Sequence, residues 1–201
     1  MIINRSVWIV EVHEKKVPED EVMDKKEDRR IAMTRRMLKD ALISMLKEKD
    51  IYHISIRELC EKADVNRTTF YKYYGSQFDL LADMEKDILD FISNTLIHNE
   101  TDPVKAIFSA CRYMEENLEF IRLIINNNVD PSFAHKLFSM ESIRESALKR
   151  YKGLRSESEL EYIYNFLTYG AFRMFCVWLN RDDREPAEDF TQLVSQILFI
   201  D

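Results

Sequence analysis

Residues 66–69 place four side chains together that can read the edges of DNA bases. The amide of Asn66 can bridge N6 and N7 of adenine, and the guanidinium of Arg67 can bridge O6 and N7 of guanine. Thr68 and Thr69 each offer a hydroxyl and a methyl group. This combination on one turn suits contact with a base sequence better than packing in a core.

Four aromatic residues and a lysine follow directly. Tyr71, Lys72 and Tyr73 come one helical turn after the polar group, and tyrosine hydroxyls and lysine ammoniums are common partners of DNA phosphates. Phe70 and Tyr74 are four residues apart, so both can pack inward from one face of a helix. The segment 66–74 therefore predicts a helix with an outer reading face and an inner anchoring face.

Two preceding helices are predicted to hold this segment. Apolar residues recur at helical spacing over 31–46 and again over 55–63. Ser55 with Glu58 three residues later is a capping box, and Asn66 can cap the next helix. Two short helices joined by a tight turn and braced by a longer one form a helix-turn-helix. In that motif the first residues of the second helix enter the major groove.

The rest of the chain is also predicted to be helical. Gly75 is predicted to end the third helix in the left-handed conformation, and Ser76 to cap a fourth helix. Three glycines and four prolines in 201 residues argue against a β protein with many tight turns. We expect an all-α chain: residues 1–25 as a poorly ordered extension, 26–76 as a helix-turn-helix DNA-binding domain, and 77–201 as a larger helical effector-binding and dimerisation domain. Further helices are predicted near 103–117, 118–126, 131–151, 159–180 and 186–199.

The charge is unevenly distributed. The chain has a net charge of −7, yet residues 26–77 carry 12 basic and 8 acidic side chains. A polyanion would be attracted to this segment and repelled by the acidic remainder.

The stretch SIRELCEKADVNRTTFYKYYGSQFDLL closely resembles the DNA-binding domain of the TetR/AcrR family of bacterial transcription regulators. The resemblance covers about 50 residues, 29–81, and FLTYGAFRMFCVWL resembles the penultimate helix of one TetR subgroup. It implies base contacts by Arg67, Thr68 and Thr69 and phosphate contacts by Tyr71, Lys72 and Tyr73. It also implies a phosphate contact by Ser55 through its hydroxyl and helix N-terminus.

Three residues depart from the family pattern. Asp64 stands where glycine is usual, and aspartate is among the few other residues that tolerate a left-handed turn. Cys60 replaces the usual alanine and is still small. Gln77 replaces a lysine at the start of the fourth helix, which would remove one phosphate charge and weaken DNA binding.

The last two helices are candidates for a dimer interface. Residues 159–180 are apolar nearly all round, which is typical of a helix buried on several sides. Both helices could instead complete the core of a monomer. The resemblance implies a four-helix interface about a twofold axis, for which we expect Tyr169, Phe172, Phe175, Trp178, Leu193 and Ile197.

The same resemblance implies an effector pocket in the C-terminal domain. Aromatic residues at this spacing are more often plain core, and arginines in apolar stretches more often form surface ion pairs. The residues predicted for a small-molecule pocket are Phe108, Arg112, Phe138, Tyr162, Phe166 and Tyr169.

Other functions have little support in the sequence. No nucleophile, P-loop or dinucleotide motif is present, and the histidines and three cysteines have no metal-ligand spacing. We expect no enzyme activity, cofactor, metal or membrane span, and a cytoplasmic location. The leading hypothesis is a ligand-responsive repressor that binds a palindromic operator as a homodimer. Alternatives are a TetR-like co-activator that binds DNA weakly and acts through a protein partner, and a small-molecule-binding helical protein that binds no DNA.

Overall fold

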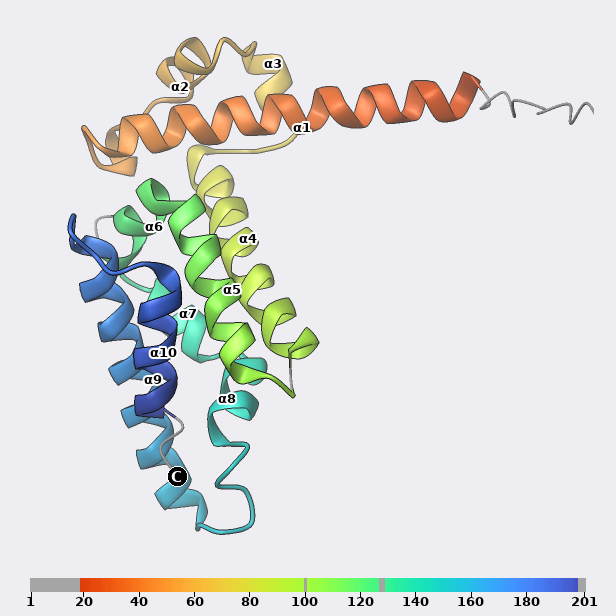
Figure 1. The fold of residues 1–201 in the computed structure, drawn as a ribbon. Coiled ribbons are helices and arrows are strands. Elements are labelled where there is room, and N and C mark those ends of the chain that lie inside the picture. Colours follow the sequence, from red (N-terminus) through yellow and green to blue (C-terminus); the bar gives the residue numbers. More distant parts are fainter. Residues whose placement is uncertain (1–18, 100, 127–128, 199–201) are drawn as a thin grey trace, which may run out of the picture. The chain divides into compact units, whose positions relative to one another are not determined.

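The computed structural model describes residues 19–99, 101–126 and 129–198 (Figure 1). The chain divides into two compact units, residues 1–36 and 37–201. The described part of the first unit is the beginning of helix α1 (Glu19–Leu46), in which the hydroxyl of Thr34 donates to the carbonyl of Arg30. Most of the predicted N-terminal extension lies outside the described residues, and the predicted domain bounds stay a prediction.

Helices are the only regular secondary structure among the described residues of the second unit, which confirms the predicted all-α class (Figure 1). This unit contains the end of α1, a single 3₁₀ turn η1 (Ile51–His53) and nine further helices. These are α2 (Ile56–Ala63), α3 (Arg67–Phe70), α4 (Gln77–His98), α5 (Pro103–Glu116), α6 (Leu118–Ile125), α7 (Phe133–Phe138), α8 (Glu141–Leu148), α9 (Glu157–Asn180) and α10 (Ala187–Leu198).

The turn between α2 and α3 forms as the sequence predicts. The hydroxyl of Ser55 accepts from the backbone N–H of Glu58, and the Glu58 carboxylate accepts from the backbone N–H of Ser55, which completes the capping box. Asp64 ends α2 in the left-handed conformation, with φ of 52°. Asn66 then caps α3 by accepting from the N–H of Thr68 at 2.8 Å.

The prediction for Gly75 is wrong, because its φ is not positive. A side chain at this position would instead have to displace the carboxylate of Asp79. The N–H of Gly75 donates to Oδ2 of Asp79 at 3.0 Å, and an added Cβ would lie 2.9 Å from that oxygen. Ser76 caps α4 as predicted, by accepting from the N–H of Asp79.

The single helix predicted over 131–151 is also wrong, since the structure has two helices there, α7 and α8. The hydroxyl of Tyr164, on α9, donates to the carbonyl of Phe138. In a continuous helix, that carbonyl would accept the backbone N–H of Ser142. The backbone is extended at Met140, so the helix is interrupted there. A hydrogen bond from a distant helix thus accompanies the break between α7 and α8.

The main hydrophobic core runs from the end of α1 through α2–α7 to α9 and α10. Near its C-terminal end the indole of Trp178 stacks on the ring of Phe190, with centroids 4.5 Å apart and an interplanar angle of 4°. The indole N–H donates to the carbonyl of Glu185, which fixes the turn into α10.

A buried charged cluster joins α4 to the start of α7. Glu85 is 2% exposed, and Nζ of Lys136 lies 2.6 Å from its Oε2. The same ammonium lies 2.6 Å from Oδ2 of Asp130. Burial raises the pKa of Glu85 despite the hydrogen bond from Lys136. The pKa of Asp130 falls to about 2, because its bonds with Lys136 and Ser132 together outweigh the effect of burial.

Candidate nucleic-acid interface

The outer face of α3 and the turn after it carry most of the predicted DNA contacts. Arg67, Thr68 and Lys72 are exposed, and Tyr71 is 57% exposed. Thr69 and Tyr73 are half-buried and reach the surface less fully. These side chains lie within two turns of one another, so α3 presents a compact polar surface with an exposed aromatic ring.

Two buried aromatic residues hold this surface in place. Phe70 is fully buried, and its ring centroid lies 5.8 Å from that of Tyr74 and 5.6 Å from that of Tyr71. The hydroxyl of Tyr74 donates to Asp83 on α4 at 2.9 Å. Asp83 also pairs with Lys39 on α1 at 2.9 Å, so the anchor of α3 is tied to two longer helices.

Ser55 is the N-cap of α2, as predicted, and its phosphate contact stays a prediction. Its hydroxyl both accepts from the N–H of Glu58 and donates to the Glu58 carboxylate at 2.8 Å. Hydrogen bonds from Lys49 and then from Ser55 lower the pKa of that carboxyl to about 2. An ionised carboxylate therefore occupies the N-terminus of α2, where it would repel a phosphate. Ser55 acts as a helix cap here.

At the start of α4, Gln77 is half-buried and follows the cap Ser76. Next to Gln77 lies an aromatic pair, Tyr52 and Phe78, that the sequence did not predict. Tyr52 is 81% exposed, and its ring packs against Phe78 with centroids 5.3 Å apart. In the sequence, Tyr52 belongs to no helical repeat and to no motif, so nothing there indicated that it forms part of this surface.

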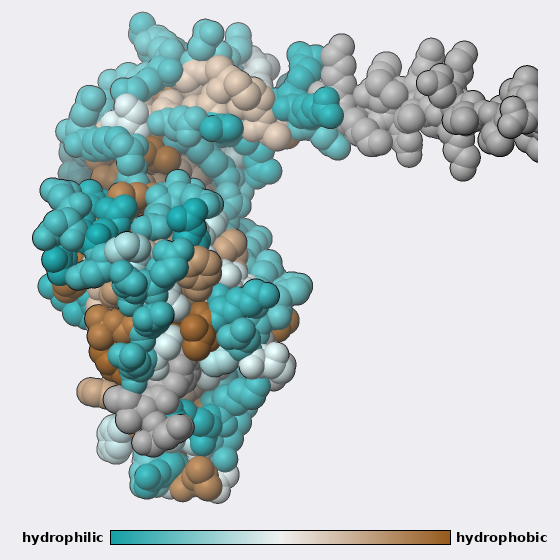
Figure 2. All heavy atoms as spheres, in the orientation of Figure 1, coloured by the Kyte–Doolittle hydropathy of each residue, from teal (hydrophilic) through white to brown (hydrophobic). Residues whose placement is uncertain are grey.

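The residues predicted for a dimer interface fall into two groups. Tyr169, Leu193 and Ile197 are exposed hydrophobic residues, as an interface requires. Phe172 and Phe175 are half-buried, and Phe175 packs edge-on against Phe190 at 5.3 Å. Trp178 is 1% exposed and belongs to the core of the protomer, so it is not available to a partner. Hydrophobic residues interrupt the hydrophilic surface in the region of α9 and α10 (Figure 2).

Of the six residues predicted for an effector pocket, Tyr162 and Phe166 line the hollow described below, and the other four are not among its lining residues. Arg112 is exposed and pairs with Glu115 and Glu116 on its own helix. Phe138 packs against Tyr169 and Phe172, with centroids 4.7 and 5.5 Å apart.

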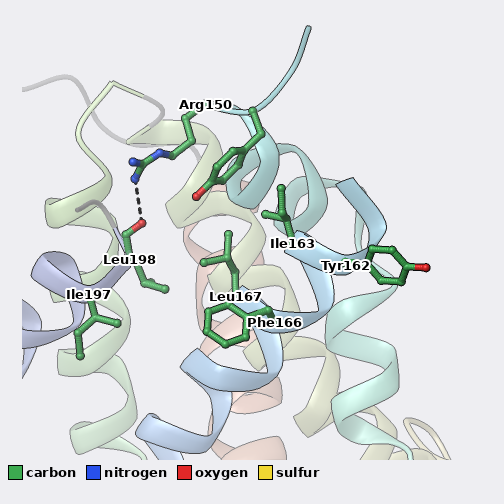
Figure 3. Close-up of a pocket in the computed structure, with 8 residues that line it drawn as sticks. Arg150, Tyr162, Ile163, Phe166, Leu167, Ile197 and Leu198 are labelled. Atoms are coloured by element: carbon green, nitrogen blue, oxygen red, sulfur yellow. Dashed lines mark hydrogen bonds between the residues drawn. The ribbon is translucent and has the colours of Figure 1, made fainter. Parts of the chain in front are cut away.

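Tyr162 and Phe166 instead border an open hollow of about 430 Å³ between the end of α8, α9 and α10 (Figure 3). Arg150 donates to the carbonyl of Leu198 across it at 3.1 Å. The lining residues are Arg150, Tyr151, Tyr162, Ile163, Phe166, Leu167, Ile197 and Leu198.

Metal sites and membrane spans are both absent from the residues that the structure describes. No group of three or more His, Cys, Asp or Glu is arranged there to hold a metal ion. No described helix is long and apolar enough to cross a membrane.

Comparison with known proteins gives matches over both parts of the chain. Residues 101–199 match the family described as a TetR-type "Transcriptional regulator C-terminal region". An uncharacterized HTH-type transcriptional regulator, YxbF of Bacillus subtilis (strain 168), is 23% identical over 173 residues. That match covers 80% of this chain but 43% of YxbF, so the chain spans less than half of the relative's length.

Two solved structures have a similar fold. A TetR transcriptional regulator from Streptococcus agalactiae 2603V gives a TM-score of 0.63 at 20% identity, over 87% of this chain and 98% of that one. The dihydroxyacetone kinase operon activator DhaS gives 0.59 at 18% identity, over 83% and 94%. The chain thus has a helix-turn-helix at residues 55–74 and a TetR-type C-terminal region at 101–199, and it is similar to TetR-type transcriptional regulators in sequence and in fold.

Proposed function

We propose that this protein is a sequence-specific DNA-binding transcription regulator that binds a palindromic operator as a homodimer. The observation that carries the proposal is the outer face of α3, where Arg67 and Thr68 are exposed at the helix start and Tyr71 and Lys72 one turn later. This order suits base contacts at the N-terminal end and phosphate contacts beside them.

The geometry of α3 favours a dimer on DNA. The helix spans four residues before a turn, so one copy reaches few base pairs. Two copies related by a twofold axis would read two half-sites, which is the usual arrangement for helix-turn-helix proteins. The exposed Tyr169, Leu193 and Ile197 provide an apolar face for such pairing.

Selection from a random pool of duplex DNA, at physiological salt, tests the proposal. We expect enrichment of a palindrome with two half-sites. A variant with Arg67→Ala and Thr68→Ala should lose that enrichment while keeping its helical content by circular dichroism. Absence of any enriched sequence for the wild-type protein would overturn specific DNA binding.

For the direction of regulation we propose repression, in which the bound dimer blocks access to the promoter. A reporter gene placed behind the selected operator should then fall in expression when the protein is supplied. Response to a small-molecule effector stays a prediction, since the described hollow is lined by only two of the residues predicted for its pocket.

The second candidate is activation through a protein partner. DhaS, a structural neighbour, is described as an operon activator. Gln77 and the acidic remainder of the chain would suit a protein that binds DNA weakly. A rise in reporter expression that requires a second protein would favour this candidate over repression.

A further inference from the structure

The outer face of α3 stands on a very short helix. Helix α3 spans the four residues Arg67–Phe70, and a turn at residues 71–73 follows it. A binding site of this kind has to hold its side chains to within about 0.5 Å. Isolated helices shorter than about 12–15 residues are marginal in water, so α3 cannot supply that precision by itself. Its orientation must come from contacts with other helices.

Apolar packing supplies only part of that orientation. The ring of Phe70 is fully buried and packs against the ring of Tyr74. Such burial is non-directional, so it holds α3 on the core without selecting one orientation. A hydrogen bond has a preferred distance and angle. The hydroxyl of Tyr74, a residue that is 5% exposed, donates to Oδ2 of Asp83 on α4 at 2.9 Å, and this bond fixes the end of the turn.

The acceptor of this bond is itself held by a second helix. The ammonium of Lys39, on α1, lies 2.9 Å from the same oxygen of Asp83 and also pairs with Asp87, one turn further along α4. Burial lowers the pKa of Lys39, but the hydrogen bonds to Asp87 and Asp83 outweigh it and raise the pKa above its usual value. The ammonium is therefore charged at neutral pH. The side chains of Lys39 and Asp83 are 22% and 20% exposed, so salt screens this pair less than a fully exposed one.

We propose that Asp83 is a positioning residue for DNA recognition: through its bonds with Lys39 and Tyr74 it sets the orientation of α3, and with it the preference for one base sequence. The inference rests on the sequence-specific DNA binding of the proposed function and names residues behind the contact surface on which it depends.

The proposal separates affinity for the operator from affinity for any DNA. Hydrogen bonds to base edges need good geometry, whereas attraction to phosphates acts over several ångströms and tolerates a small rotation of the helix. A misoriented α3 should therefore lose its preference for the operator and keep most of its binding to unrelated duplex DNA.

Tyr74→Phe tests the hydrogen bond, because it keeps the buried ring and changes no charge. We expect the Kd for the operator to rise about tenfold and the Kd for unrelated DNA to change by less than about twofold. The matched control is Tyr164→Phe, which removes another hydroxyl from a buried tyrosine, the one that donates to the carbonyl of Phe138. It should lower the midpoint of urea unfolding about as much as Tyr74→Phe and leave both Kd values unchanged.

Asp83→Asn tests the carboxylate. The amide oxygen can still accept from Tyr74, but the charge that pairs with Lys39 is gone. Removing an acidic charge would by itself tighten binding to DNA, whereas a loss of positioning weakens it on the operator. We expect the Kd for the operator to rise about fivefold. Asp90→Asn removes an exposed carboxylate that pairs with Lys86 on the same helix, and it should not raise that Kd.

Combining Tyr74→Phe with Asp83→Asn tests whether both residues act through one bond. The Kd of the double variant for the operator should rise by less than the product of the two single increases. Fluorescence anisotropy at physiological salt, on the operator and on an unrelated duplex, gives every Kd.

The outcomes separate two failures. A wild-type protein with equal affinity for all duplexes would overturn the proposed function and this inference with it. A wild-type protein that prefers its operator, with a Tyr74→Phe variant that keeps the same preference, would leave the proposed function standing and overturn the positioning role. Tighter binding by Asp83→Asn, or a loss by Tyr164→Phe as large as that by Tyr74→Phe, would also overturn it.

Discussion

At the scale of single residues, some polar side chains of the helix-turn-helix cap helices, while others are exposed and are proposed here to contact DNA. Ser55 and Asn66 are the caps of α2 and α3, and their side-chain oxygens accept backbone N–H groups. The side chains of Arg67 and Thr68 cap no helix and are exposed. The two caps hold the turn, and the next residues are free to meet bases.

Substitutions on α3 should separate base contacts from phosphate contacts. Tyr71→Ala is expected to weaken binding to all DNA sequences by a similar factor. Arg67→Ala or Thr68→Ala should cost about 1–3 kcal/mol on the preferred operator and relax the preference at one base pair. Fluorescence anisotropy on the operator and on single-base variants gives both quantities. Equal losses on every sequence for all three variants would contradict the division.

Asp64 holds a strained conformation at the end of α2. A side chain at φ of 52° costs free energy that glycine avoids. We therefore expect Asp64→Gly to raise the free energy of unfolding by about 1 kcal/mol. The matched control is Asp50→Gly, where φ is −63° and glycine should lower stability. Urea denaturation measures both, and a change of the same sign in the two variants would refute the explanation.

At the scale of elements, the cluster of Glu85, Lys136 and Asp130 joins α4 to the start of α7. Oε1 of Glu85 accepts no hydrogen bond from the described residues, so Lys136 supplies the main compensation for a buried charge. Such a pair gives little net stability but is costly to break. This charged cluster holds α4, and α4 also anchors α3 through the hydrogen bond from the Tyr74 hydroxyl to Asp83.

Lys136→Met should therefore destabilise the fold by about 3 kcal/mol at pH 7, the low end for a broken buried pair, because Lys136 is itself 43% exposed. The added change Glu85→Leu should recover much of the loss. A buried carboxyl with a raised pKa takes up a proton on folding, so the single variant should regain stability as the pH falls from 7 to 5. Asp130, with a pKa of about 2, stays ionised in this range. Urea unfolding at both pH values measures the effect, and an unchanged deficit at pH 5 would argue against a charged Glu85.

At the scale of the whole molecule, charge separates the chain into a basic segment and an acidic remainder. Residues 26–77 have an excess of four basic side chains, while the full chain carries −7. A polyanion is therefore attracted by part of the chain and repelled by the rest, and affinity for DNA should depend steeply on salt.

Gln77→Lys tests this electrostatic balance. One added cation beside a phosphate in each copy of a dimer should steepen the slope of log K against log salt by about 1.8. Binding at low salt should tighten, and sequence preference should not change. Titrations at four salt concentrations give the slope, and an unchanged slope would place Gln77 away from the DNA.

The sequence alone determined the local structure of the N-terminal half. Capping residues and helical period act between neighbours in the chain, so Ser55, Asp64, Asn66 and Ser76 could be assigned before any fold was known. The all-α class followed from the same local rules, and the similarity to TetR-type regulators followed from the motif over residues 29–81 together with the comparisons.

Tertiary structure decided the features that depend on residues far apart in the chain. Trp178 is buried where Phe190 stacks on it, and the carbonyl of Phe138, at the break between α7 and α8, accepts a hydrogen bond from Tyr164 on α9. The sequence does not distinguish aromatic residues that line a pocket from those that pack in a core or form an interface. Only their neighbours in space distinguish the buried Trp178 from the exposed Tyr162, Phe166 and Tyr169, because burial is a property of the packed chain and not of the residue.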